Sequence, residues 1–595
     1  MGKLSLTTRL AKKLAPGLSA LGLMGLAVSA HGAANPAMKI CAMSPADSSA
    51  VIIFRDPAAL DRKIVQIAGQ LKIPVSQDPL ASSEQSMGLT GIFDANRPAG
   101  IAMLPPPKGN LQPTSQWMVA MVPVTNYAAA EKAYQCAAPQ NGISAGQDPT
   151  GTPIFLAQQG GYALFSPLKD ALIAFMANKV MLSGTLSPTY MKGVSGSDVS
   201  TYLNMKVLGP IASAGLSAES QMMLGFEAGD PSQLQSAAVQ LIFVRLMEQF
   251  LGNSQRQFIG VHITNRGISL QEIGDMQPGT PMGQLLAAQS AMGKAPLAGL
   301  PGGRYVVAQA YSVNGLALSQ WLKTLERPRQ TTGALGPIEK NLEKDLAIYG
   351  QFVANVRESS SVMLSSRHGG GISAVGLGTY TDATGIIKSL EGFMPKVLKM
   401  MNAPNAAGPK PFAITYKPKA ISVGNVSMTR IEMKPSPGNH SVASMFKTVF
   451  GQPEIVEYFG TLSKTQAVWT MSMPAAKMPA LIAASKTRVN ALGLSPSIQL
   501  AQKHVLPQAT CVSYLLINRL LSDMAANLRK ANGLPQPATN GLVLGRRFAP
   551  MVISASAQGN RMRIKAFVPM ATLEDTVNQG RALAPLFMLM SEQAQ

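Results

Sequence analysis

A short unit recurs along this chain: a run of β-forming residues ends at Pro, Asn, Asp or Ser, and a helical pattern follows at once. In the first copy, residues 51–54 lead to Asp56 and Pro57, and apolar residues then recur every three or four positions from Leu60 to Leu71. That spacing predicts an amphipathic helix, and Asp followed by Pro is a favoured helix start. The same order recurs at 117–134, 162–167, 199–204, 305–314, 374–382, 468–474, 511–518 and 564–569.

Polar, glycine-bearing turns join other strand pairs and predict β-hairpins. The predicted pairs are 154–157 with 162–165, 258–264 with 268–273, 362–366 with the strand after Gly371, and 552–557 with 562–568. Hairpins alternating with helices favour antiparallel sheets and the α+β class over a doubly wound parallel sheet.

The units fall on both sides of a breaker-rich stretch at residues 293–303, which contains four glycines and two prolines. We therefore expect two α+β modules, 36–292 and 304–595, separated by that linker. Because both modules repeat the same strand–helix and hairpin–helix units, we expect them to be related by internal duplication.

The N-terminal residues 1–33 have the order of a secretory signal peptide. Four cations, the first Lys3 and the last Lys13, precede an apolar run from Leu14 to Ala30, and small residues follow. The run is short for a membrane span, which needs about 20 apolar residues. An uncleaved N-terminal anchor is the alternative. We expect a cleaved signal and a periplasmic or secreted protein.

Charge is sparse and one-sided in this chain. Charged residues make up 14%, and 51 Lys and Arg face 30 Asp and Glu, for a formal net charge of +21. Removal of the four cations of the predicted signal leaves +17 on the mature chain. An exported cationic protein favours anionic envelope lipid, polysaccharide or wall polymer as a partner, and export argues against nucleic acid. Peripheral membrane contact and an apolar small ligand are compatible with this composition, and oligomeric state stays open.

Part of the positive excess collects between residues 396 and 434, where the only carboxylate is Glu432. Lys417 and Lys419 alternate along a predicted strand, which would place both on one face. We predict an anion-binding face, with a solvated outer face or a protected sheet edge as the alternative. Its candidate residues are Lys396, Lys399, Lys410, Lys417, Lys419, Arg430 and Lys434.

Three cysteines in an exported chain suggest one disulfide and one free thiol. Cys41 and Cys136 lie in the same half of the chain, and we predict that they pair. Cys511 lies in a predicted strand, where a small buried side chain is the expected role.

The five histidines give no metal-ligand spacing. His262 lies mid-strand, and none of the others stands beside a second His, a Cys or a carboxylate at the spacing a zinc site needs. The 34 methionines occur in amphipathic contexts and are expected to fill cores. Phosphate-binding glycine loops are also missing from the sequence. We therefore expect neither a metal nor a cofactor.

One short motif carries a catalytic alternative. Ser166 and Lys169 match S-x-x-K after a strand, a spacing at which the Lys amine can take the Ser proton in serine acyl-transferases. Ser followed by Pro167 is equally a helix cap, and the accompanying S-D-N and K-T-G motifs are missing. The carboxylates at 56, 61, 94, 198 and 382 fall at turns or helix starts, where capping accounts for them.

The first 210 residues resemble a family of exported bacterial proteins of unknown function. The segments that carry the resemblance are 44–47 with 50–54, 93–98 with 99–104, 161–167 and 199–204. The resemblance implies a large periplasmic α+β protein and supplies no catalytic residue. The hairpin and helix repeats are also similar to lipoprotein-carrier folds, a likeness of fold alone.

Three functions are compatible with these patterns. The leading hypothesis is an exported, non-enzymatic binding or envelope-associated protein for a lipid-like or anionic envelope ligand. A serine acyl-transferase or hydrolase that uses Ser166 and Lys169 is the second. A structural or assembly protein of the envelope is the third.

Overall fold

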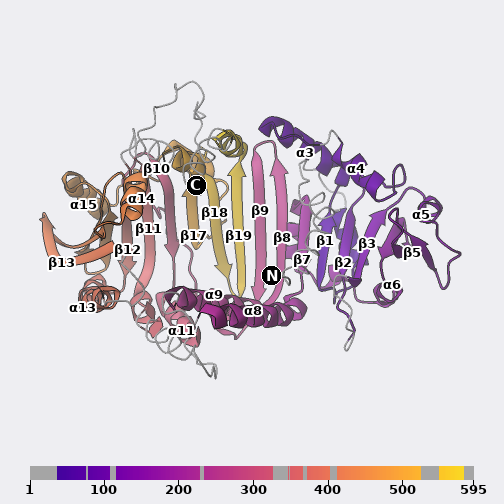
Figure 1. Ribbon diagram of the computed structural model, residues 1–595, viewed down its shortest axis with the longest axis horizontal. Coiled ribbons are helices and arrows are strands. Elements are labelled where there is room, and N and C mark those ends of the chain that lie inside the picture. Colours follow the sequence, from indigo (N-terminus) through magenta and orange to yellow (C-terminus); the bar gives the residue numbers. More distant parts are fainter. Residues whose placement is uncertain are drawn as a thin grey trace. The chain divides into compact units, whose positions relative to one another are not determined.

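The protein folds as two compact units (Figure 1). Unit 1 comprises residues up to 211 together with 254–275, and unit 2 comprises 212–253 and the residues from 276 onward. The computed structural model describes residues 36–75, 78–107, 116–227, 234–325, 346–347, 349–365, 371–402, 412–523, 549–579 and 581. The predicted signal, residues 1–33, lies outside the described residues.

Unit 1 is built on an antiparallel sheet of order β4-β5-β6-β3-β2-β1-β7-β8, and β9 follows β8 through the two-residue turn Asn265-Arg266. The strands are β1 (Ala50–Phe54), β2 (Ala99–Met103), β3 (Met118–Pro123), β4 (Ile143–Gln147), β5 (Pro153–Gln159), β6 (Tyr162–Ser166), β7 (Val199–Leu203), β8 (Ser254–Thr264) and β9 (Gly267–Met276). The hairpins predicted at 154–165 and 258–273 are therefore confirmed.

Helices cover both faces of this sheet. They are α2 (Ala37–Met43), α3 (Pro57–Leu71), α4 (Pro79–Ser86), α5 (Tyr127–Ala133), α6 (Lys169–Ala177), the short η2 (Leu182–Gly184) and α7 (Pro188–Gly196). The predicted start of α3 is confirmed, because the side chain of Asp56 accepts a hydrogen bond from the N–H of Ala59 at 2.8 Å. Helix α8 (Met205–Glu227) then carries the chain from unit 1 into unit 2.

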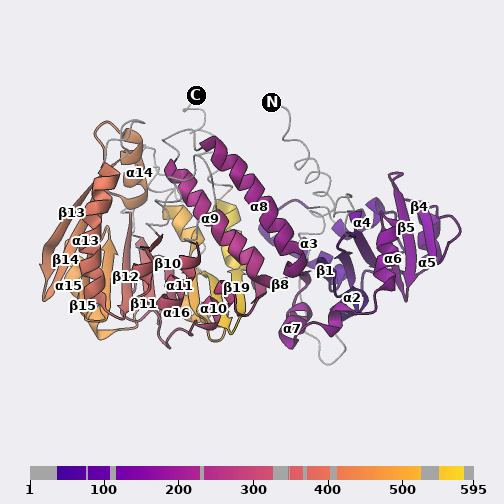
Figure 2. The same ribbon diagram turned by 90° about the horizontal axis from the view of Figure 1, so that it is seen from below.

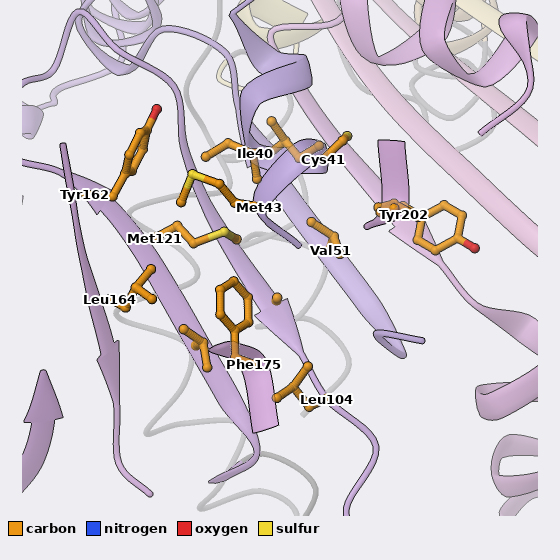
Figure 3. Close-up of a cluster of buried hydrophobic side chains, with 14 of the residues drawn as sticks. Ile40, Cys41, Met43, Val51, Leu104, Met121, Tyr162, Leu164, Phe175 and Tyr202 are labelled. Carbon is orange, nitrogen blue, oxygen red and sulfur yellow. The ribbon is translucent and has the colours of Figure 1, made fainter. Parts of the chain in front are cut away.

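Alternation along each strand divides the apolar side chains between the two faces. Met121 and Leu164 join the large core beneath α2, α6 and α7, which Figure 3 shows in close-up. Their chain neighbours Val122 and Phe165 join a second core on the opposite face, beneath α5. The sheet of unit 1 is therefore the middle layer of three.

The layering explains why the three cysteines are free thiols. Cys41 lies in the α2 core, fully buried, whereas Cys136 packs against the α5 core on the other face of the sheet. The predicted Cys41–Cys136 disulfide is wrong in this structure, because the sheet lies between the two sulfur atoms. Cys511 is half-buried in β17 (Cys511–Leu515), and burial raises the pKa of its thiol.

Unit 2 is built on a longer antiparallel sheet of order β13-β14-β15-β16-β12-β11-β10-β17-β18-β19. Its other strands are β10 (Tyr305–Ser312), β11 (Val356–Ser365), β12 (Ile372–Tyr380), β13 (Phe412–Val423), β14 (Val426–Pro435), β15 (Ile455–Ser463), β16 (Gln466–Met471), β18 (Met551–Gln558) and β19 (Arg561–Pro569). The hairpin predicted at 552–568 is confirmed, and β11 and β12 pair as predicted for 362–366 and its successor, although residues 366–370 of their turn lie outside the described residues.

The helices of unit 2 are α9 (Leu234–Asn253), α10 (Pro281–Ala287), α11 (Gly315–Leu325), α13 (Ala383–Asn402), α14 (His440–Phe450), η4 (Ala475–Lys477), α15 (Met478–Thr487) and α16 (Pro496–Gln502). Helix α13 lies along the β13–β15 end of the sheet (Figure 2). Helices α15 and α16 cover the main core, and Leu297 and Leu300 are buried in that same core. Residues 293–303, predicted as a linker, thus contribute apolar side chains to unit 2.

The two units share one order of strand pairing. In unit 1 the pairs are β1–β2, β2–β3, β3–β6, β5–β6, β4–β5, β1–β7 and β7–β8; in unit 2 they are β10–β11, β11–β12, β12–β16, β15–β16, β14–β15, β10–β17 and β17–β18. Unit 2 adds β13 at one edge. The α+β class is confirmed, and the common pairing is the pattern that a duplicated module gives.

Candidate functional site

The predicted anion-binding residues fall on α13 and on the hairpin β13–β14. Lys396 and Lys399 lie on α13, where the structure describes the backbone alone, and Lys410 lies outside the described residues. Lys417 and Lys419 lie on β13, and Arg430 and Lys434 lie on β14.

Register brings three of these cations to one face of the hairpin, which we call the cationic face: Lys417, Arg430 and Lys434. Lys417 stands directly opposite Arg430, and Lys434 lies two alternations further along β14. Lys417 is exposed and has no ion-pair partner in the part of the chain that the structure describes. The prediction that basic side chains gather here is therefore realised for these three residues.

The prediction that Lys417 and Lys419 alternate onto one face does not hold, because the strand is irregular between them. Residues 417 and 421 of β13 pair with 430 and 428 of β14, so β13 contains two extra residues there. Lys419 adopts a left-handed backbone with φ of 50°, and its N–H lies 3.4 Å from the Thr429 hydroxyl. A bulge of this kind redirects side chains and ends simple alternation.

Two carboxylates partly neutralise the cationic face. The ammonium of Lys434 lies 2.6 Å from Glu432 and 3.2 Å from Glu454, and the guanidinium of Arg430 lies 3.2 Å from Glu432. The hydrogen bond from Lys434 is the largest cause that holds the pKa of Glu432 below its ordinary value. Three cations against two carboxylates leave one positive charge on the face. Glu454 lies beyond the 396–434 segment, and sequence counting therefore missed it.

A cleft of about 360 Å³ opens beside this face. Lys434 and Glu454 line it on one side, and Asn439 and His440, at the start of α14, line it on the other. Asn439 caps α14 by accepting a hydrogen bond from Val442 N–H at 3.1 Å. A lysine ammonium beside a helix N-terminus is an arrangement that attracts anions.

The S-x-x-K pair occupies a buried position. Ser166 ends β6 and is 1% exposed, and its Oγ accepts a hydrogen bond from Leu168 N–H at 3.2 Å. No contact joins it to Lys169 among the described residues. The hydroxyl thus makes a local turn before α6, which begins at Lys169 with Leu168 at its N-cap position and without a side-chain cap, so the predicted helix cap at Ser166 is wrong. Catalysis by this pair stays an untested prediction.

A second polar cluster lies in unit 1, and we call it the Asp198 cluster: Asp198, Arg55, Lys63 and His262. Asp198 is 5% exposed, and one of its oxygens contacts the guanidinium of Arg55 and lies 3.4 Å from Lys63 Nζ. The other oxygen lies 3.2 Å from His262 Nδ1 and accepts a hydrogen bond from Ile263 N–H at 3.1 Å.

Strand register assembles the Asp198 cluster. Asp198 directly precedes β7, and its N–H donates to the carbonyl of Val261 in β8. Arg55 directly follows β1, and its N–H donates to the carbonyl of Asp198. Lys63 reaches the same carboxylate from α3. Three strands and a covering helix therefore meet at one carboxylate.

The groups around Asp198 favour its ionised form. Burial would raise the pKa of Asp198, but His262, Ile263 N–H, Lys63 and Arg55 outweigh burial and lower it. Burial lowers the pKa of Lys63 to about 8, although Asp198 acts in the opposite direction. The arrangement joins strand ends to helix α3 through charge-assisted contacts.

Sequence reasoning placed Asp198 at a turn and assigned it to capping, which is wrong. The capping assignment holds for Asp56 and for Asp382, whose side chain accepts from Gly385 N–H at 2.9 Å. Asp198 differs because two strands far apart in sequence lie beside it, and no local pattern reports on them. The one available signal was Lys63, a lysine on the apolar stripe of α3.

Two searches of the described residues gave no further site. They contain no group of three or more His, Cys, Asp or Glu side chains that could hold a metal ion. None of the helices in the described ranges combines the length and apolarity that crossing a membrane takes.

Comparisons with known proteins give two distant structural matches. No protein-family profile and no curated protein matches the chain. A solved structure titled "Structure of crystal form III of TP0453" is 8% identical, has a TM-score of 0.22, and covers 48% of this chain and 97% of its own. "Structure of crystal form IV of TP0453" is 10% identical, with a TM-score of 0.21 and coverages of 48% and 96%. TM-scores this low carry no argument about fold or function.

Proposed function

We propose that this protein is an exported, non-enzymatic binding protein of the cell envelope that recognises an anionic ligand. The cationic face of β13–β14 is the observation that carries the proposal. Lys417, Arg430 and Lys434 share that face, and the cleft at the start of α14 adjoins Lys434. Anionic envelope lipid, polysaccharide or wall polymer would supply the negative charge.

The geometry supports binding better than catalysis. The cleft is lined by Lys434, Glu454 and the start of α14, and although Ser436 and His440 also line it, no hydrogen bond joins that serine to a base among the described residues. Ser166, the serine nucleophile that the sequence suggested, is buried, and its hydroxyl accepts a hydrogen bond from Leu168 N–H. The ion pairs at Glu432 and Glu454 fix the positions of Arg430 and Lys434 before a ligand arrives. Such preorganisation lowers the entropic cost of binding.

The test combines ligand retention with a charge variant. We expect native mass spectrometry of the purified protein to reveal a co-purified anionic molecule, or the protein to bind anionic vesicles or wall polymer less tightly as salt rises. The variant Lys417→Gln/Lys434→Gln should weaken that binding. Lys323→Gln is the matched control, because Lys323 is exposed on α11 in the same unit and away from this hairpin.

Two results would contradict the proposal. One is a protein without retained ligand and without salt-dependent binding to either material. The other is equal weakening by the control Lys323→Gln, which would indicate a non-specific effect of net charge.

A further inference from the structure

Unit 2 carries a second surface whose composition differs from that of the cationic face. Helix α15, the connection that follows it and α16 pack onto the main core through Leu481, Leu492 and Ile498. Their outer side presents three aliphatic side chains to solvent: Val489, Leu494 and Leu500, with exposed fractions of 51%, 62% and 69%. We call this the α15–α16 surface. Single exposed aliphatic residues are ordinary, whereas three within twelve residues are a local concentration of exposed apolar side chains.

The charges that the α15–α16 segment itself carries all have one sign, although Glu358 of β11 lines a small pocket together with Arg488. Residues 458–522 contain no Asp or Glu, and they contain six Lys and Arg. Four of these cations are exposed and flank the aliphatic side chains: Lys477, Lys486, Arg488 and Lys503. None of the four has an ion-pair partner among the described residues. Lys486 donates to the side chain of Asn425, a neutral group at the tip of the β13–β14 hairpin.

We propose that the α15–α16 surface docks onto a lipid bilayer that contains anionic lipid. The aliphatic side chains would enter the interface between headgroups and acyl chains, and the four cations would contact the headgroups. This inference rests on the proposed function in one respect, namely that the partner is anionic. It adds a place, an orientation and a partner class, because exposed aliphatic side chains gain nothing from a soluble polyanion.

Charge complementarity selects the bilayer over other partners. A second copy of this chain would bring the same four cations against the patch, and like charges at short distance repel. A bilayer with anionic headgroups supplies negative charge to every cation and an apolar layer to every aliphatic side chain.

Unit 1 offers a matched control. Its corresponding segment, α6 and the connection after it, also exposes three apolar side chains: Ile173 and Met176 on α6 and Val180 after it, at 47%, 37% and 61%. Carboxylates accompany this segment, since Asp170 lies on α6 and Asp47 accepts a hydrogen bond from Asn178 at 2.9 Å. The control therefore has a similar apolar exposure in a mixed-charge setting.

The experiment is flotation with vesicles of phosphatidylglycerol and phosphatidylcholine in equal parts, and with phosphatidylcholine alone. We expect the wild type to float with the anionic vesicles, less so at high salt, and to stay behind with the neutral ones. Val489→Ser/Leu494→Ser/Leu500→Ser should lower partitioning by about tenfold. Ile173→Ser/Met176→Ser/Val180→Ser should leave it unchanged. Lys477→Gln/Lys486→Gln/Lys503→Gln should lower partitioning into the anionic vesicles and reduce its salt dependence.

Binding to dextran sulfate, a soluble polyanion, separates this inference from the proposed function. We expect the triple serine variant at 489, 494 and 500 to bind dextran sulfate as the wild type does. The assignment to α15–α16 is overturned if the triple serine variant at 489, 494 and 500 floats like the wild type. It is also overturned if the unit 1 control variant loses as much partitioning into anionic vesicles as that variant does. If the wild type binds dextran sulfate but neither kind of vesicle, the inference that the partner is a bilayer is overturned, and the proposed function is unaffected. A wild type that binds neither vesicles nor dextran sulfate overturns both.

Discussion

Units 1 and 2 pair their strands in the same order, yet they differ in whether a charged residue lies at the junction of three of those strands. Unit 1 buries Asp198 at the point where β1, β7 and β8 meet. The equivalent backbone position in unit 2 is Thr510. Its N–H donates to the carbonyl of Ala555, and its carbonyl accepts from Ser312 N–H. In the same way, the N–H of Asp198 donates to the carbonyl of Val261, and its carbonyl accepts from Arg55 N–H. The fold therefore tolerates either charge or hydroxyl at this junction.

The correspondence extends to the other members of the cluster. By strand register, Arg55 of unit 1 corresponds to Ser312 of unit 2, and His262 corresponds to Ser556. Unit 2 thus has three hydroxyl residues where unit 1 has a carboxylate and two bases. Ion pairs of unit 2 lie elsewhere, at Glu432 on the β13–β14 hairpin and between Arg304 and Asp523. The comparison teaches that the Asp198 cluster is a local elaboration, which the shared architecture does not require.

The largest expected effect follows from removal of the central carboxylate. Asp198→Ala leaves Arg55 and the buried Lys63 without their counter-charge, and such a loss typically costs about 3–5 kcal/mol of stability. Urea unfolding of the wild type and the variant, followed by hydrogen exchange resolved to unit 1, measures it. A loss below about 1 kcal/mol would mean that the cluster is equivalent to a surface ion pair.

Replacement of the whole cluster should cost less than loss of its acid. Arg55→Ser, Lys63→Met, Asp198→Thr and His262→Ser together install the hydroxyl arrangement of unit 2 and replace every titratable side chain of the Asp198 cluster with a neutral one. We expect the fourfold variant to recover at least about half of the stability that Asp198→Ala loses, because a buried ion network can be replaced by neutral groups at small cost. The same urea unfolding assay measures this stability. A fourfold variant less stable than Asp198→Ala would show that the hydroxyl residues of unit 2 cannot replace the Asp198 cluster in unit 1.

An intermediate effect concerns Lys63 and pH. Its pKa of about 8 in the folded state lies below its ordinary value of 10.5, so the unfolded chain binds more protons between these values. Stability should therefore rise with pH in this window. Relative to Lys63→Met, the wild type should gain about 1 kcal/mol between about pH 7 and pH 9. A difference between the two proteins that is flat or falls with pH would contradict the assignment.

The smallest effect is expected in unit 2. Glu432→Gln removes the acid that contacts Arg430 and Lys434, but the side chain of Lys434 is 54% exposed. Exposed ion pairs contribute about 0–1 kcal/mol, and salt should reduce this further. Unfolding at low and high salt measures it. A cost as large as that of Asp198→Ala would erase the distinction between a buried and a surface cluster.

Local sequence patterns were sufficient to predict individual helices and hairpins. They were insufficient to predict which elements lie beside one another. The start of α3 at Asp56 and the hairpins of β5–β6, β8–β9 and β18–β19 follow from capping and turn residues within a few positions. The cationic face was predicted in part, because Lys417, Arg430 and Lys434 are close in sequence. Glu454 and the bulge after Lys417 were missed, since both depend on how neighbouring strands pair.

The sequence by itself determined the α+β class, the alternation of strand and helix and the positive bias of the chain, because each of these depends on spacing along a few residues or on composition. The tertiary structure decided which residues meet. It separated Cys41 from Cys136 by a sheet, and it joined Asp198 to Arg55, Lys63 and His262. It also showed that the acid-free stretch 458–522 presents aliphatic side chains outward at α15–α16. The physical reason is that sheet pairing and layer order act between residues far apart in sequence, where periodicity carries no information.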